Sequence, residues 1–94
     1  HFCEGLGLDL QIHACGPAHR AVISAIRNTH LYEMALIGPK MLNIVPPVYT
    51  CGYSDQSEDL HADGTVVVPD GPGLGVEYNW DFISKNKVFH QVFD

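Results

Sequence analysis

The sequence predicts an α/β fold, because a period-two stretch, a helical stretch and a second apolar stretch follow one another near its start. Apolar and polar residues alternate over residues 8–13, as in a strand with one buried face. Small and apolar residues recur at helical spacing over residues 17–28, after a Gly-Pro start that suits a first-turn proline. The apolar run at residues 30–37 ends at Gly38-Pro39, which is typical of a strand buried on both faces.

Two ionisable side chains lie in the predicted strands, His13 at the end of the first and Glu33 within the second. A right-handed βαβ crossover makes such strands parallel and adjacent, so we expect His13 and Glu33 to be neighbours. Catalytic residues of parallel barrels lie at the C-terminal ends of strands, and a glutamate in a buried run is costly unless it is paired or functional. Tyr32 and Met34 should point the opposite way, into the core. The alternatives are a hydrogen-bonded histidine at a strand end and a Glu33 paired with an arginine or lysine of another element.

The rest of the chain predicts shorter elements. Residues 1–7 resemble the last turn of a helix that ends at a glycine. We therefore expect that residue 1 is not the natural start of the chain. The other expected elements are a connector at 39–47, an edge strand at 48–52, a loop or single helical turn at 54–59, a strand at 65–68, a glycine turn at 71–75 and a short helix starting at 81–83.

Composition limits the function classes. A net charge of −6 with five lysines and arginines argues against a nucleic-acid or anionic-membrane surface, and favours small molecules or proteins as partners. The sequence has no run of about 18 apolar residues and no basic-then-apolar leader, so neither a membrane span nor a signal peptide is expected. Three cysteines without a CxxC pair favour reduced thiols in a cytoplasm over a disulfide framework or a thiolate zinc site.

Three further motifs have simpler explanations. His13, Cys15 and His19 lack the four closely paired ligands of a structural zinc site. The glycines at 71–75 are not followed by the helix that a phosphate loop needs. No oxyanion arrangement accompanies Cys15, so a small buried thiol is expected rather than a nucleophile.

The stretches IHACGPAHR, LYEMAL, NIVPPVY and VVVPDGPGLGVEYNWDFI together resemble the C-terminal end of the mandelate racemase and muconate lactonizing branch of the enolase superfamily. The resemblance implies the C-terminal part of a modified TIM barrel, (β/α)7β, with an α+β capping domain built from both chain ends. Residues 8–13, 17–28 and 30–36 would be the seventh strand, seventh helix and eighth strand. Residues 1–38 would end the barrel domain, and residues 39–94 would return to the capping domain.

The same resemblance implies the chemistry. His13 corresponds to the base that removes the proton α to a carboxylate, and Glu33 to the glutamate that bonds the substrate carboxylate, for which it would be protonated. The enediolate product needs a metal ion and hydrogen-bond donors for its charge. We expect a Mg²⁺-dependent dehydratase of acid sugars (aldonates or aldarates), a lyase in which the β-hydroxyl then departs. The alternatives are a racemase or cycloisomerase of the superfamily and a non-catalytic binding or assembly protein that keeps the fold.

Several expected parts lie outside these 94 residues, since a complete eight-stranded parallel barrel has about 250 residues. By the resemblance, the Mg²⁺ carboxylates, the aspartate partner of His13 and the opposite-face lysine are upstream of His1. The 94-residue piece alone is therefore expected to be inactive, and the complete enzyme to be a homo-oligomer. Because its parallel strands would have unpaired edges, the piece is also expected to lack cooperative unfolding.

Overall fold

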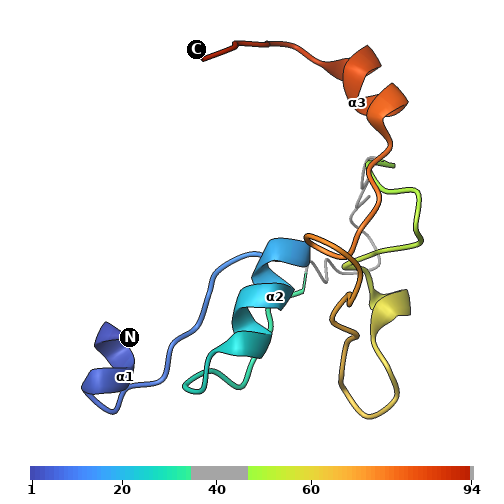
Figure 1. The fold of residues 1–94 in the computed structure, drawn as a ribbon. Coiled ribbons are helices and arrows are strands. Elements are labelled where there is room, and N and C mark those ends of the chain that lie inside the picture. Colours follow the sequence, from blue (N-terminus) through green and yellow to red (C-terminus); the bar gives the residue numbers. More distant parts are fainter. Residues whose placement is uncertain (35–46, 94) are drawn as a thin grey trace.

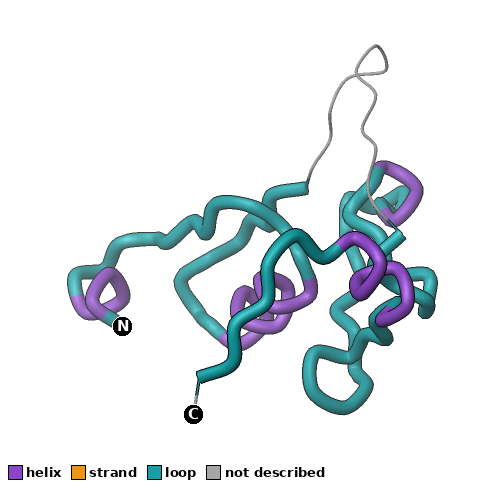
Figure 2. The backbone as a smooth tube through the Cα atoms, turned by 90° about the horizontal axis from the view of Figure 1, so that it is seen from above, coloured by secondary structure: helices purple, strands orange, loops and turns teal. Residues whose placement is uncertain are grey.

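Residues 1–34 and 47–93 are described by a computed structural model, in which short helices are joined by long connecting segments (Figure 1). The helices are α1 (Phe2–Gly5), α2 (Pro17–Ala25), the 3₁₀ turn η1 (Ser57–Asp59) and α3 (Trp80–Asn86). The tube of Figure 2 contains no strand in these two ranges.

The predicted helix after Gly16 is confirmed as α2, with a shorter extent than expected. It begins at Pro17, and the N–H of Arg20 donates to the carbonyl of Gly16 at 3.0 Å. It ends at Ala25 because Ile26 is extended, with φ −104° and ψ 148°. The residues up to Asn28, expected to be helical, belong to the segment that leads away from α2.

The strands expected at 8–13 and 30–37 form no β-ladder among the described residues, so these two element predictions are wrong there. Two hydrogen bonds hold the segments together at one end: the N–H of Leu10 to the carbonyl of Asn28, at 2.7 Å, and Asn28 Nδ2 to the carbonyl of Leu8, at 2.9 Å. The second run is not buried on both faces either, because Leu31 is 64% exposed. Parallel strands need covered faces and paired neighbours, which these residues do not supply. Residues 35–37 of the run lie outside the described residues, and the α/β barrel stays a prediction.

The expected edge strand at 48–52 is reduced to one antiparallel bridge between Tyr49 and Tyr78. The N–H of Thr50 donates to the carbonyl of Glu77 at 3.0 Å, and the N–H of Asn79 donates to the carbonyl of Val48 at 2.8 Å. The strand predicted at 65–68 does not form. Most of the expected connector, residues 39–46, lies outside the described part of the chain.

Three local predictions in the second half are confirmed. The helical turn within 54–59 is η1, and the short helix at 81–83 is part of α3, where the side chain of Asn79 accepts the N–H of Phe82 at 3.0 Å. The segment 71–75 is a glycine turn closed by a bond of 3.1 Å from the N–H of Gly75 to the carbonyl of Pro72. Gly75 has φ +70°, and a Cβ there would lie 2.5 Å from Cβ of Pro69, so this turn requires glycine.

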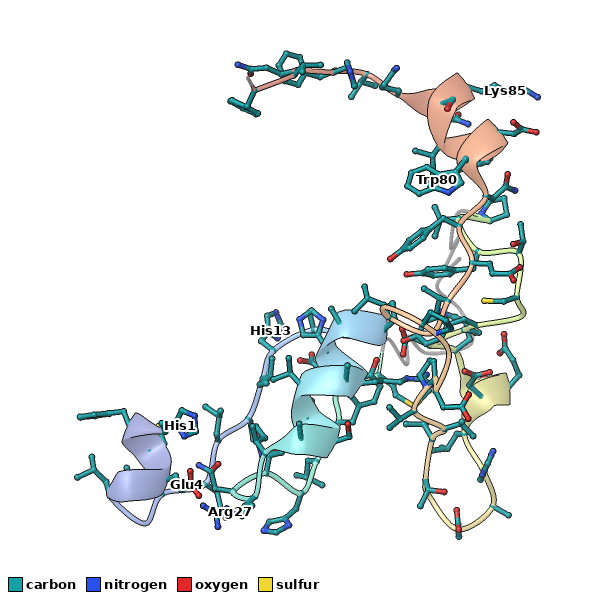
Figure 3. All side chains as sticks on the ribbon, in the orientation of Figure 1. His1, Glu4, His13, Arg27, Trp80 and Lys85 are labelled. Atoms are coloured by element: carbon teal, nitrogen blue, oxygen red, sulfur yellow. The ribbon has the colours of Figure 1, made fainter. Side chains whose placement is uncertain are left out.

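The N-terminal helical turn is also confirmed as α1, with Gly7 as its stop. Gly7 has φ +68°; its N–H donates to the carbonyl of Glu4 at 3.0 Å and the next N–H, of Leu8, donates to the carbonyl of Cys3 at 2.9 Å. This pair of bonds is a Schellman cap. Figure 3 shows His1, Glu4 and Arg27 gathered at this end of the molecule, where Arg27 Nη2 and Glu4 Oε1 are 2.5 Å apart.

The described residues enclose no apolar core: none of their aliphatic or aromatic side chains is fully buried. The radius of gyration is 15.9 Å, compared with about 12 Å for a compact domain of this length. The most buried charged side chain is Arg20 of α2, which is 3% exposed. The second half of the chain is therefore held to α2 by polar contacts. None of the helices in the described ranges is long and apolar enough to cross a membrane.

Candidate functional site

His13 and Glu33 lie in direct contact, as the sequence predicts, although no β-ladder in the described part of the chain aligns them. His13 Nδ1 is 2.9 Å from Glu33 Oε2. The same oxygen accepts the backbone N–H of Ala14 at 2.6 Å. One carboxylate oxygen thus joins an imidazole and the turn that carries it.

The pair lies at the edge of an open pocket of about 530 Å³. Its lining consists of two triplets of consecutive residues, namely Gln11, Ile12 and His13, and Leu31, Tyr32 and Glu33. The His13 side chain is 93% exposed, and Figure 3 shows it on the segment that leads into α2. A small molecule can reach the imidazole directly from solvent.

The environment of Glu33 favours its ionised form. The N–H of Ala14 lowers the pKa of the Glu33 carboxyl most, desolvation acts in the opposite direction, and the hydrogen bond and charge of His13 lower the pKa further. Glu33 is therefore a carboxylate at neutral pH and can only accept hydrogen bonds. This differs from the expectation that a protonated Glu33 donates a bond to a substrate.

The ionised Glu33 also decides which nitrogen of His13 is available. A carboxylate has no proton to give, so Nδ1 of His13 is the donor in the 2.9 Å contact. In the neutral imidazole the lone pair is then on Nε2, which faces away from Glu33. The arrangement can accept a proton at Nε2 and stabilise the resulting imidazolium.

The turn between His13 and α2 has an unusual backbone. Ala14 has φ +75°, a left-handed conformation that costs a non-glycine residue about 1 kcal/mol or more. Gly16, with φ +131°, is the residue before the helix. This turn directs the N–H of Ala14 towards Glu33. A strained turn of this kind persists only where surrounding contacts hold it.

A buried polar cluster beside the pair was not expected from the sequence. Its centre is Arg20, whose Nη2 and Nε lie 2.8 and 3.2 Å from Oδ1 of Asp55. The guanidinium also donates to the carbonyls of Val67 and Ser54, both at 2.7 Å, and reaches Asp59 at 3.3 Å. The Asp55 side chain, within the loop or helical turn predicted at 54–59, is only 11% exposed. The sequence signal for this cluster is weak: an arginine inside a short apolar helix and two aspartates four positions apart.

Tyr32 connects this cluster to the loop that carries His13. Its hydroxyl accepts the N–H of Gly16 at 2.8 Å and donates to Asp55. Arg20 Cζ lies 5.2 Å from the centre of the Tyr32 ring and 4.6 Å from that of Tyr53. Tyr32 therefore lies towards α2, as predicted, but its surroundings are polar rather than an apolar core.

The pKa values of the cluster follow from its contacts. Burial raises the pKa of Tyr32, and the hydrogen bond to Asp55 raises it further. The pKa of Tyr53 is raised for the same two reasons, together with its hydrogen bond to Tyr32. Burial acts to lower the pKa of Arg20, but its hydrogen bonds to Tyr32 and Asp55 outweigh that effect and raise it. The cluster thus keeps a charged Arg20 next to neutral phenols.

The structure also describes His13, Cys15 and His19, which are not expected to form a structural zinc site. Across the described residues no group of three or more His, Cys, Asp or Glu side chains could hold a metal ion. The side chains described here therefore offer no ligand set for Mg²⁺, and the ligands expected upstream of His1 stay a prediction. No disulfide joins Cys3, Cys15 and Cys51, all three of which are described.

Comparison with protein-family models, with curated proteins and with solved structures finds no match for this chain. The resemblance to the mandelate racemase and muconate lactonizing branch therefore stays a prediction.

Proposed function

We propose that this chain contributes the acid–base pair of an enzyme that removes the proton α to the carboxylate of an acid sugar. The observation that carries the proposal is the contact of 2.9 Å between Nδ1 of the exposed His13 and Oε2 of the ionised Glu33. A histidine oriented by a carboxylate and open to a pocket is a common form of general base.

In this proposal His13 Nε2 takes the α-proton. Glu33 holds the ring in one tautomer and stabilises the imidazolium that forms, which is the role its hydrogen bonds support. The enediolate that remains needs further positive charge. The resemblance to the enolase superfamily assigns that task to Mg²⁺ held by residues upstream of His1, in a complete polypeptide that contains these 94 residues.

The fate of the enediolate decides the reaction class. Departure of the β-hydroxyl gives a dehydration, which is the reaction we favour, and His13 can return its proton to the leaving oxygen. Return of a proton to the α-carbon, or ring closure, would make the protein a racemase or a cycloisomerase. A non-catalytic binding role is the third possibility, and it predicts no proton abstraction.

The test follows the α-proton of acid sugars in deuterium oxide. In the complete polypeptide with Mg²⁺, His13→Asn should lower the rate of α-deuterium incorporation by about 10²-fold or more, because the amide can still contact Glu33 but cannot accept a proton. His61→Asn in the exposed turn at 61–64 is the matched control and should keep the wild-type rate. A wild-type rate of α-deuterium incorporation in His13→Asn would show that His13 is not the base.

Product analysis on a panel of aldonates and aldarates completes the experiment. A 2-keto-3-deoxy product identifies the dehydratase, and an epimer or lactone identifies the alternatives. A complete polypeptide that exchanges no α-proton on any member of the panel would contradict the enzymatic proposal and leave the binding role.

A further inference from the structure

We propose that Tyr32 is a positioning residue that holds the loop at 13–16 in place, so that Ala14 and His13 meet the carboxylate of Glu33. The inference rests on the proposed function only for its catalytic consequence. The positional claim concerns contacts within the chain and is tested separately.

Adjacent side chains of the segment 31–33 hold the same loop from two sides. Glu33 accepts the N–H of Ala14 at 2.6 Å, and the hydroxyl of Tyr32 accepts the N–H of Gly16 at 2.8 Å. The two N–H groups belong to residues only two positions apart. The loop is therefore fixed at two points by one short segment.

The loop needs such contacts because its backbone is not in a favoured conformation. Ala14 and Gly16 both have positive φ, +75° and +131°. Without external hydrogen bonds, Ala14 would relax to the ordinary region at negative φ, and its N–H would turn away from Glu33. The bond from Gly16 to Tyr32 lies on the helix side of Ala14 and opposes that rotation.

The hydroxyl of Tyr32 is itself oriented by the second half of the chain. A phenol has one proton, and Tyr32 donates it to Asp55, which leaves a lone pair for Gly16. Arg20 fixes Asp55 through two contacts, and the Asp55 side chain is 11% exposed. Through Tyr32, the segment at 53–59 thereby influences the geometry of the His13–Glu33 pair.

Tyr53 provides a matched control for this role. It is a phenol that donates to the same carboxylate, at 2.8 Å from Asp55 Oδ2, and it also lies against Arg20. Its hydroxyl also interacts with that of Tyr32, but none of its described hydrogen bonds reaches the loop at 13–16. Removing either hydroxyl disturbs the cluster in the same chemical way, but only the loss of the Tyr32 hydroxyl releases Gly16.

The experiment uses the ionisation of Glu33 as its measure. In the complete polypeptide labelled with ¹⁵N-alanine, the amide signal of Ala14, identified by its loss in Ala14→Gly, is followed from neutral to acid pH. The charged groups that act on Glu33 are His13 and His19, and the Ala14 N–H is the largest influence on its pKa. In the wild-type protein the signal should titrate with a midpoint below 4.5, the ordinary value for the carboxyl.

In Tyr32→Phe the midpoint should rise towards the ordinary value, while Tyr53→Phe should keep the wild-type midpoint. Asp55→Asn should shift the midpoint in the same direction as Tyr32→Phe. If Tyr32→Phe does not fold, the midpoint in Asp55→Asn is the test of the positioning role. An unchanged midpoint in Tyr32→Phe, or equal shifts in both phenylalanine variants, would overturn the positioning role.

Steady-state kinetics of α-proton exchange measure how the loss of the Tyr32 hydroxyl affects catalysis. Tyr32→Phe should lower kcat for α-proton exchange about tenfold with little change in KM, since misplacement of a catalytic group affects the chemical step. Tyr53→Phe should keep both constants. If the wild-type protein exchanges no α-proton, the proposed function fails, while the titration still decides whether Tyr32 positions the pair.

Discussion

Arg20 and Asp55 form an ion pair across 35 positions of sequence, with Nη2 and Oδ1 at 2.8 Å and side chains that are 3% and 11% exposed. A buried pair of this kind is strongly coupled, because removing one partner leaves the other charge in a poorly solvated place. The pair joins α2 to the second half of the chain. It therefore gives the clearest prediction for stability.

Arg20→Met should lower the free energy of unfolding of the complete polypeptide by about 3 kcal/mol, because Asp55 would keep its charge without a cationic partner. Urea denaturation measures this difference. Arg27→Met is the matched control: Arg27 pairs with Glu4 but its side chain is 87% exposed, so the loss should be below about 1 kcal/mol. Equal losses in the two variants would contradict the role given to Arg20.

The contact between Glu33 and the loop should disappear in acid. The pKa of Glu33 is lowered in the folded chain, so its contribution to stability is fully present above the ordinary value of 4.5 and is lost as the pH falls through the folded-state pKa. Glutamate labelled with ¹³C at the carboxyl gives the titration, and Glu33→Gln identifies its signal. A midpoint at or above 4.5 would show that Ala14 and His13 do not stabilise the carboxylate.

Ala14→Gly should leave the protein as stable as the wild type or stabilise it by up to about 1 kcal/mol. Glycine removes the strain of φ +75°, and this gain is partly offset by the greater freedom of glycine in the unfolded chain. Ala21→Gly, in the middle of α2, should instead destabilise the protein by about 1 kcal/mol. Urea denaturation compares them, and a loss in Ala14→Gly as large as in Ala21→Gly would argue against the left-handed turn.

The 94-residue chain by itself should unfold without a cooperative transition. No aliphatic or aromatic side chain among residues 1–34 and 47–93 is fully buried, so no unit is available to melt as a whole. Calorimetry and circular dichroism during heating should give gradual changes. A sharp transition of a monomer would contradict this expectation, and with it the proposal that further strands complete the fold.

Local patterns predicted the elements whose causes are local. The helical spacing and the proline after Gly16 predicted α2, and the glycines at 71–75 predicted the turn that Gly75 closes. In each case the decisive residues lie within a few positions of one another. Such interactions are present in the sequence before any tertiary contact forms.

The same reasoning predicted strands at 8–13, 30–37 and 65–68, and none of them forms in the described residues. The alternation over 8–13 describes which side chains would share a face, but a strand also needs a neighbour to pair with. The prediction that His13 and Glu33 meet was confirmed, but by another route. Hydrogen bonds to Ala14 and Gly16, rather than a parallel ladder, bring the two residues together.

The residue pattern alone was sufficient for the positions of the short helices and turns and for the prediction that His13 and Glu33 are neighbours. Only the folded arrangement revealed the ionised state of Glu33 and the cluster of Arg20 and Asp55. The physical reason is range: caps and periodicities act over a few residues, whereas the charge state of a carboxyl and the partner of a buried arginine depend on groups that only folding brings near.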